Sequence, residues 1–249
     1  MPGPQVETTE GSKAPVGKGD FLFPGTSPDL RQLLKTHHRG FRAGSILKVE
    51  AEESGAIYCL LSGWLALSKL TEDGERQIID VILPGEIVHP SSADSHTSWI
   101  QIETLCYATV AVVPQAAWAR LEAADPCMRR IEAVTIAASL SRMSERMLRL
   151  GKGTAESRIA YALTEICIRL KAIGESDVCD YHLPMTQQDL GDFVGLSSVH
   201  VCRTLRRLSR SGVISTADHM DITIHDLDRL AGIAGVDLDR LRAEIISAR

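Results

Sequence analysis

The segment from residue 186 to residue 210, TQQDLGDFVGLSSVHVCRTLRRLSR, constrains the fold of this chain more than any other. Its first half has three apolar residues at the i, i+3 and i+4 spacing of one helix face: Leu190, Phe193 and Val194. Thr186 is placed to cap this helix, and Gly195 suits a turn with positive φ. Gly191 lies inside the helix, where a glycine indicates close approach of a second helix backbone. The segment therefore predicts a helix-turn-helix.

The second half of the segment predicts a helix with one apolar face and one cationic face, capped by Ser197 or Ser198. Its inward positions are Val201, Leu205 and Leu208. Its outward positions are Ser198, Val199, Cys202, Arg203, Arg206 and Arg210. This outward face contains no acidic residue, which favours contact with DNA. An ordinary amphipathic helix with a solvated basic face is the alternative interpretation.

In a helix-turn-helix, the amino-terminal part of the second helix contacts base edges, while later arginines and the turn reach phosphates. Four residues are therefore assigned to bases: Ser198, Val199, His200 and Arg203. Arg206 and Arg210 are assigned to the DNA backbone. The starts of the two helices complete the predicted set: Thr186, Gln187 and Ser197. Arg203 is the strongest candidate, because a guanidinium can donate two hydrogen bonds to guanine, worth about 1 to 3 kcal/mol of discrimination.

Length and charge agree with a two-domain protein that is not a general nucleic-acid coat. The chain has 249 residues and a formal net charge of -5, so any DNA binding must come from a local basic patch. No run of about 18 apolar residues occurs, and the amino-terminal segment lacks the apolar core of a signal peptide. We expect a cytoplasmic protein with no membrane partner.

The six cysteines are scattered and form no C-x-x-C pair: Cys59, Cys106, Cys127, Cys167, Cys179 and Cys202. This spacing predicts neither a disulfide framework nor a zinc site, and most of the thiols are expected to be free in cores. Cys202 is the exception, because it faces outward on the second helix, where its modification would put bulk into a DNA groove. Cys106 or Cys179 could respond to oxidation if a neighbouring group lowered its pKa.

The pattern of the amino-terminal half indicates an antiparallel β-roll. Residues 1–20 are polar and rich in Gly, Pro and Lys, which is typical of a disordered arm. Residues 21–124 contain short apolar runs broken by turns at intervals of about ten residues, as expected for a roll or barrel. The pair Asp73–Gly74 predicts a hairpin turn between two of these runs.

Residues 125–150 predict one long helix that begins near Asp125–Pro126. Apolar residues recur in it at alternating steps of three and four: Ala133, Ile136, Leu140, Met143, Met147 and Leu150. Such a heptad stripe indicates pairing with the same helix of a second subunit. A helix that packs on its own roll is the alternative.

Residues 151–249 predict the DNA-binding domain with a helical tail. A hinge at Gly151–Gly153 precedes an amphipathic helix over residues 155–173, which packs beneath the helix-turn-helix. Val213–Ile214 and residues 221–224 should pair as a hairpin wing, followed by one or two short helices. The fold class is therefore α+β.

This order of parts resembles the Crp/Fnr family of bacterial transcription regulators from about Leu30 to Ile224. The segments that carry the resemblance are FRAG at 41–44, YCLLSG at 58–63, Asp73–Gly74, PGE at 84–86, SRIA at 157–160 and MTQQDLGDFVGLSSVHVCRTLRRL at 185–208. The resemblance implies a cyclic-nucleotide-binding-like double-stranded β-roll, a dimerisation helix and a winged helix-turn-helix. It also implies a homodimer on a palindromic operator that acts through RNA polymerase, as an activator. Arg203 matches the family's base-contacting arginine, but many members have a glutamate near Val199 or His200, so the family's half-sites do not carry over.

The effector expected from the resemblance is not supported by the residues of the roll. Members that bind a cyclic nucleotide hold its phosphate with an arginine after the Gly-Glu pair, whereas this chain has no lysine or arginine between Arg76 and Arg120. A buried phosphate needs such a cation, so we predict that cyclic AMP and cyclic GMP do not bind in the usual way. The residues that could line a different pocket are Gly85, Glu86, His89, Ser91, Ser92 and His96.

No cofactor or metal is predicted. An iron-sulfur cluster held by amino-terminal cysteines, as in some relatives, is not expected because no cysteine precedes Cys59, while haem on His37–His38 or His89 remains an open alternative. No catalytic motif is present, so the chain is not expected to be an enzyme. A β-roll that binds a ligand and acts on a protein partner is the other functional hypothesis, but it would leave the cationic helix without a role.

Overall fold

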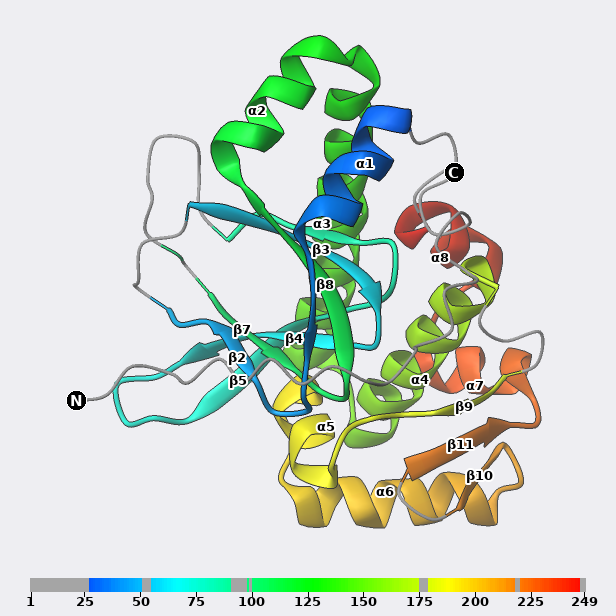
Figure 1. Cartoon of the computed structure of the whole chain (residues 1–249). Coiled ribbons are helices and arrows are strands. Elements are labelled where there is room, and N and C mark those ends of the chain that lie inside the picture. Colours follow the sequence, from blue (N-terminus) through cyan, green and yellow to red (C-terminus); the bar gives the residue numbers. More distant parts are fainter. Residues whose placement is uncertain are drawn as a thin grey trace.

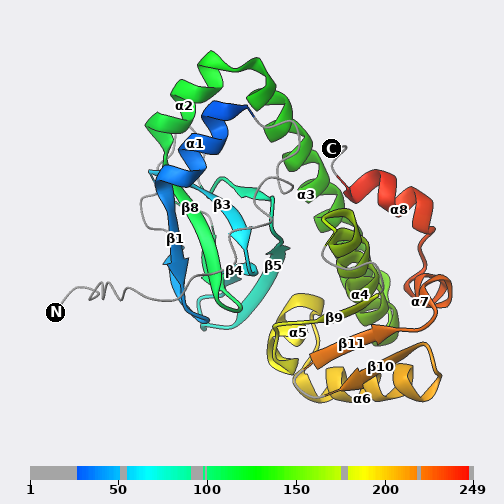
Figure 2. The same cartoon turned by 45° about the vertical axis from the view of Figure 1, so that its right-hand side comes forward.

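A computed structural model describes residues 27–50, 55–90, 98, 100–174, 179–217 and 220–246. It shows a β-roll and a C-terminal domain, with one long helix running beside the roll and into the C-terminal domain (Figures 1 and 2). The arm expected at residues 1–20 lies outside the described residues. Among the residues that the structure describes, no helix combines the length and the apolar composition needed to cross a membrane.

The roll consists of two facing four-stranded antiparallel sheets. One sheet has the order β1-β8-β3-β6, from His38–Phe41, Ala108–Pro114, Ala56–Ser62 and Ile87–Val88. The other has the order β2-β7-β4-β5, from Ile46–Lys48, Gln101–Thr104, Leu65–Leu70 and Arg76–Ile82. The predicted hairpin at Asp73–Gly74 is confirmed, since β4 pairs with β5 across it and Gly74 has a φ of 84°. Leu60, Leu65 and Ile102 lie in the core between the sheets and are fully buried.

Two helices close the outer side of the first sheet. They are α1 (Pro28–His37) and α2 (Gln115–Ala124), and both pack against β8. Leu30 and Trp118 join residues of the sheet in a second apolar cluster that also contains Met128 of the long helix. This cluster fixes where the long helix starts relative to the roll.

The long helix α3 spans Pro126–Lys152, close to the predicted 125–150. Asp125 caps it by accepting a hydrogen bond from the Cys127 backbone N–H, and Pro126 occupies the first turn, where no amide donor is required. The helix ends within the predicted segment Gly151–Gly153, with Lys152 as its last residue and Gly153 at its C-cap.

The C-terminal domain is built around α4 (Ala155–Ala172), whose residues 159–170 are all buried. A helix buried all round must be covered by neighbours, and α4 contacts α3, α5, α6 and α7. The helix-turn-helix consists of α5 (Gln187–Val194) and α6 (Ser198–Arg210). The predicted wing pairs β10 (Ile214–Ala217) with β11 (Asp221–Ile224), and the tail forms α7 (Leu227–Ala234) and α8 (Leu238–Ile245).

A third strand of the wing sheet, β9 (Asp180–His182), was not predicted from the sequence. It pairs with β11, so the sheet order is β10-β11-β9. Three residues are too short a run to show the alternation typical of a strand.

The prediction that the core cysteines are free thiols is wrong for one pair. Cys167 of α4 and Cys179 form a disulfide, with their Cα atoms 5.6 Å apart. The other four cysteines take part in no disulfide, as expected. The pair was missed because a spacing of 12 positions between two cysteines matches no recurrent motif, and only the reversal of the chain from α4 to β9 brings them together.

Candidate nucleic-acid interface

Helix α5 begins with a reciprocal pair of capping hydrogen bonds. The Thr186 hydroxyl accepts from the Asp189 backbone N–H at 3.0 Å, and the Asp189 carboxylate accepts from the Thr186 backbone N–H at 2.9 Å. Burial raises the pKa of Asp189, but hydrogen bonds from Thr186 and from the Arg76 guanidinium outweigh it, so this pKa lies below its ordinary value. The start of the helix-turn-helix is therefore fixed by its own polar residues.

The turn between α5 and α6 depends on two glycines. A Cβ at Gly191 would lie 2.3 Å from the carbonyl oxygen of Leu196, which confirms a close backbone approach there. The sequence had suggested that this backbone belongs to the second helix, but it belongs to the turn. Gly195 has a φ of 66°, as predicted for the corner. Together they bring α6 tightly against α5.

Helix α6 has the two faces that its sequence predicts. Ser197 caps it and accepts a hydrogen bond from the His200 backbone N–H. The inward residues Val201, Leu205 and Leu208 are buried in the domain core. The predicted base-reading residues Val199, His200 and Arg203 are exposed, whereas Ser198 is half-buried. Val199 is 60% exposed, so its apolar side chain is accessible to a partner at this end of the helix.

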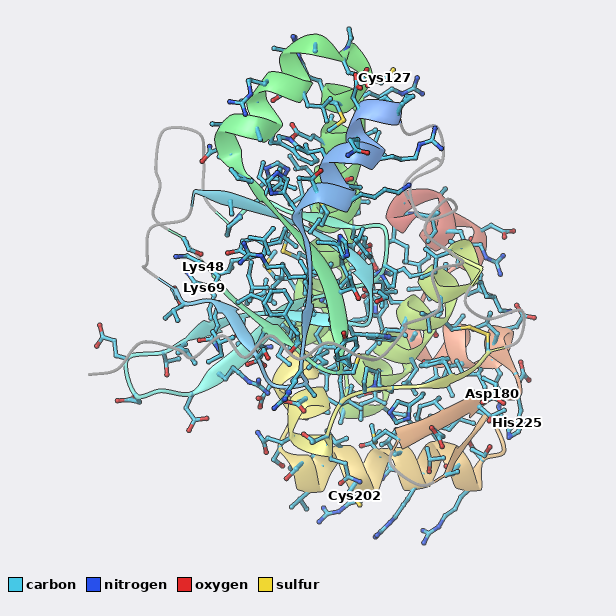
Figure 3. The ribbon with its side chains drawn as sticks, viewed as in Figure 1. Lys48, Lys69, Cys127, Asp180, Cys202 and His225 are labelled. Carbon is cyan, nitrogen blue, oxygen red and sulfur yellow. A yellow bond between two sulfur atoms is a disulfide. The ribbon has the colours of Figure 1, made fainter. Side chains whose placement is uncertain are left out.

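The outer face of α6 is cationic along its length. Arg203, Arg206 and Arg210 are exposed, and Thr186 and Gln187 are exposed at the start of α5. Figure 3 shows Cys202 on this outer side, at the edge of the molecule farthest from α2. The face therefore offers hydrogen-bond donors and positive charge to a partner, with an amino-terminal end suited to base edges.

Arg207 also belongs to this face, and the sequence analysis did not assign it. It is exposed and its guanidinium lies 3.6 Å from the Glu156 carboxylate. Its position four residues after Arg203 places both on one side of the helix, and this spacing could have identified it.

Among the described residues proposed for an effector pocket, Glu86 and His89 have different partners. Glu86 points toward the C-terminal domain, where its carboxylate accepts hydrogen bonds from Arg169 at 2.6 Å and from the Leu83 backbone N–H at 2.9 Å. His89 instead lies against the Trp118 ring, 3.4 Å from the Glu132 carboxylate, and burial lowers its pKa. Ser91, Ser92 and His96 lie outside the described residues.

Six charged side chains form a buried cluster between the roll, α3 and α4, which we call the interdomain ionic cluster. Its members are Asp80, Glu86, Arg142, Arg146, Glu165 and Arg169. Asp80 accepts hydrogen bonds from Arg142 at 2.9 Å and from Arg146 at 2.7 Å, and all three side chains are buried. Burial alone would raise the pKa of Asp80, but the arginine charges lower it well below its ordinary value.

This cluster was not predicted from the sequence. Arg142 and Arg146 are spaced by four residues on α3, as are Glu165 and Arg169 on α4, so each pair shares one helix face. That spacing is also typical of exposed ion pairs on a helix, which is why it gave no signal of burial.

A second polar contact joins the roll directly to the helix-turn-helix. Arg76 of β5 donates to the carboxylates of Asp189 and Asp192 on α5 and of Glu103 on β7. Gln77 donates to the Asp192 backbone carbonyl. The start of α5 is thus held by the roll as well as by its own capping bonds.

The predicted dimer stripe on α3 is largely uncovered in the single chain. Ile136, Leu140 and Met147 are 60%, 60% and 70% exposed, and Leu148 beside them is 55% exposed. Ala133 is also exposed and Met143 is half-buried. Leu150, the last residue of the predicted stripe, is half-buried, and its side chain lies near the turn of the same chain, where a Cβ on Gly195 would lie 2.6 Å from it.

Comparisons with known proteins match both halves of the chain. Residues 38–125 match the cyclic nucleotide-binding domain model, and residues 157–233 match the Crp-like helix-turn-helix domain model. The transcriptional activator protein Anr of Pseudomonas aeruginosa is 28% identical over 95% of this chain and 96% of its own length. The nitrogen fixation regulation protein FixK of Bradyrhizobium diazoefficiens is 31% identical over 84% of this chain and 88% of its own. The solved structure of FixK2 from Bradyrhizobium japonicum superposes with a TM-score of 0.70 at 25% identity, covering 80% and 98% of the two chains.

Proposed function

Because the chain belongs to the Crp/Fnr family of transcription regulators, with a helix-turn-helix DNA-binding domain, we propose that it binds a palindromic operator as a homodimer. The observation that carries the proposal is the outer face of α6, which is exposed and cationic. The preceding helix α5 is capped at its start and ends in a glycine turn, which positions α6. Two such helices would enter successive major grooves about 34 Å apart.

The dimer is supported by the uncovered stripe on α3. Ile136, Leu140 and Met147 expose more than half of their surface, which is costly for a helix in water unless a second surface covers it. Pairing α3 with α3 of a second copy would bury this stripe along a two-fold axis. The same axis would relate the two copies of α6, as a palindromic site requires.

The effector is proposed not to be a cyclic nucleotide bound in the usual way. The roll offers no lysine or arginine between Arg76 and Arg120 to neutralise a phosphate, and the carboxylate of Glu86 is already engaged by Arg169. A different signal would have to act through other residues of the roll or through the C-terminal domain.

The regulator is proposed to act in the cytoplasm through contact with RNA polymerase. This part of the proposal rests on the family and on relatives that are named transcriptional activators. An enzymatic role is not proposed, since the relatives are regulators.

The test is selection of genomic DNA fragments by the purified full-length protein, followed by gel shifts over a series of salt concentrations. Arg203→Ala should lose preference for the selected sequence, because the arginine reads a base, at a cost of about 1 to 3 kcal/mol. Arg206→Ala and Arg210→Ala should weaken binding to all sequences and reduce the salt slope by about one per phosphate contact.

Arg240→Ala serves as the matched control, since Arg240 is an exposed arginine on α8, away from α6 (Figure 1). Arg240→Ala should change neither the preference for the selected sequence nor the salt slope. Equal losses on selected and random DNA for Arg203→Ala would contradict the assignment of this arginine to a base. Failure of the wild-type protein to select any fragment would contradict the function itself.

A further inference from the structure

The disulfide between Cys167 and Cys179 joins two structural parts of the DNA-binding domain, the helix α4 and the wing sheet. Cys167 lies on α4, the central helix that contacts α6. Cys179 directly precedes β9, the third strand of the wing sheet. Both side chains are buried, at 1% and 4% exposure. The bond therefore connects the wing sheet to α4, the helix that contacts α6.

Backbone hydrogen bonds carry this connection further into the wing. The Cys179 carbonyl accepts from the Ile224 backbone N–H at 2.7 Å, at the end of β11. The Tyr181 hydroxyl donates to the Leu163 carbonyl at 3.0 Å, so β9 also contacts α4 one turn before Cys167. A change at the disulfide would therefore affect β9 and its neighbouring strand β11, which belongs to the wing hairpin.

The redox state of the cytoplasm bears on the role of this disulfide. A regulator that binds bacterial DNA works in the cytoplasm, where thiol pools keep most cysteines reduced, and disulfides that do form there are usually transient or redox-sensing. We propose that Cys167 and Cys179 form a redox-responsive pair, and that oxidation strengthens DNA binding by holding the wing sheet against α4. The proposal rests on the proposed DNA-binding function for its readout.

The reaction is thiol–disulfide exchange with a small-molecule disulfide such as glutathione disulfide. One protein thiolate attacks a glutathione sulfur, which forms a mixed disulfide and releases one glutathione thiolate. The second protein thiolate then attacks the protein sulfur of that mixed disulfide and releases the second glutathione. Two electrons pass from the protein thiols to glutathione disulfide, and the two thiol protons are lost to the thiolates released or to solvent.

Burial makes thiol–disulfide exchange at this pair slow and selective. Because neither sulfur reaches the surface, exchange requires local opening of the chain around Cys179. Cys127 is exposed at the start of α3 and Cys202 is half-buried on α6 (Figure 3), so both react more readily but have no cysteine partner in the described chain. They provide the internal comparison for the experiment.

The first measurement maps the bond in the wild-type protein equilibrated at a series of glutathione ratios. Trypsin should release a linked pair of peptides covering residues 159–169 and 172–203 from the oxidised protein. The second peptide contains Cys202 as well, so a further digestion at aspartate distinguishes it from Cys179, because Asp180 and Asp189 lie between the two cysteines. Absence of a Cys167–Cys179 link at the most oxidising ratio overturns the proposal.

The second measurement compares the DNA affinity of the oxidised and reduced forms on a selected fragment. The reduced form is expected to bind on the order of fivefold more weakly, at the low end of typical couplings between sites. The double variant Cys167→Ala/Cys179→Ala should bind alike at every glutathione ratio, whereas Cys127→Ser should keep the wild-type difference. Equal affinity of the two wild-type forms overturns the inference alone, while lack of sequence preference in both forms overturns the proposed function.

Discussion

Gly191 shows how a residue with poor helix propensity can be required inside a helix. Glycine costs about 1 kcal/mol relative to alanine in a helix interior. At this position, however, a Cβ would meet the Leu196 carbonyl oxygen at 2.3 Å, and the backbone on both sides of the contact cannot move without opening the turn. The contact also includes the hydrogen bond from the Leu196 backbone N–H to the Gly191 carbonyl, at 3.0 Å.

Gly191→Ala is therefore expected to lower the free energy of unfolding by about 1 to 3 kcal/mol, as overpacking of a tight contact typically does. Urea unfolding followed by circular dichroism measures this change. Gly232→Ala is the matched control, because Gly232 lies in α7 with nothing within 4 Å of a Cβ and a backbone suited to alanine. That substitution should stabilise by about 0.4 to 1 kcal/mol. Destabilisation by both variants to the same extent would contradict the contact at Gly191.

Arg203 and Arg207 show which contacts can be predicted from single residues of the sequence and which cannot. Both follow from helix spacing alone, yet only Arg203 was assigned, because it lies in the earlier part of the helix, where base edges are contacted. The contact between Arg207 and Glu156 could not be foreseen, since Glu156 lies on α4, a different helix far away in the sequence.

At the scale of elements, α3 carries two faces with different partners. The face toward the roll and α4 holds the buried arginines Arg142 and Arg146, while the opposite stripe leaves Leu140 and Met147 exposed. The heptad pattern predicted the stripe because apolar periodicity is local. It could not predict that charged residues on the other face are buried, because that depends on carboxylates of the roll.

Leu140→Glu should convert the proposed dimer into a monomer, since two carboxylates would be brought together where two leucines pack. Analytical ultracentrifugation at micromolar concentration measures the change. Leu70→Glu applies the same chemical change to an exposed leucine of β4 on the roll, 44% exposed, and should leave the assembly state unaltered. A Leu140→Glu protein that sediments as the wild type does would mean that α3 is not the dimer interface.

At the scale of the whole molecule, the interdomain ionic cluster determines how the DNA-binding domain sits on the roll. Three arginines and three carboxylates are taken out of water together, so each charge depends on its partners for compensation. Arg76 adds a second connection to α5. The roll and the DNA-binding domain are therefore joined by two separate polar contacts.

Asp80→Asn should lower the free energy of unfolding at neutral pH by about 3 to 5 kcal/mol, because it leaves Arg142 and Arg146 buried without their main counter-charge. The pKa of Asp80 is lowered in the folded protein, so its contribution is present above its ordinary pKa of about 3.9 and is lost as the pH falls through the folded value. The difference between wild type and variant should therefore shrink below about pH 4.

Urea unfolding at a series of pH values measures this difference. Asp239→Asn is the control, since the Asp239 side chain is 93% exposed and pairs with Arg242 on the surface. Its unfolding curves should match those of the wild type at every pH. A constant difference between wild type and Asp80→Asn down to pH 2 would show that Asp80 does not titrate as described.

Cyclic AMP and cyclic GMP should not shift the thermal unfolding of the full-length protein. A ligand present at 100 times its Kd would stabilise the folded state by about 2.7 kcal/mol, which is easily measured. The selected operator fragment serves as the positive control and should raise the midpoint. A rise of several degrees with either nucleotide would mean that the roll compensates a phosphate without a nearby lysine or arginine.

By itself, the sequence determined the α+β architecture, the helix-turn-helix with its cationic face, the wing and the apolar stripe of α3. Each of these is written in residues a few positions apart, through capping, periodicity and turn chemistry. Only the tertiary structure decided that Glu86 faces Arg169, 83 residues away, that Asp80 meets Arg142, 62 residues away, and that Cys167 pairs with Cys179. Such pairs arise where separate segments are packed against each other, and no local pattern specifies which buried charges or thiols will meet.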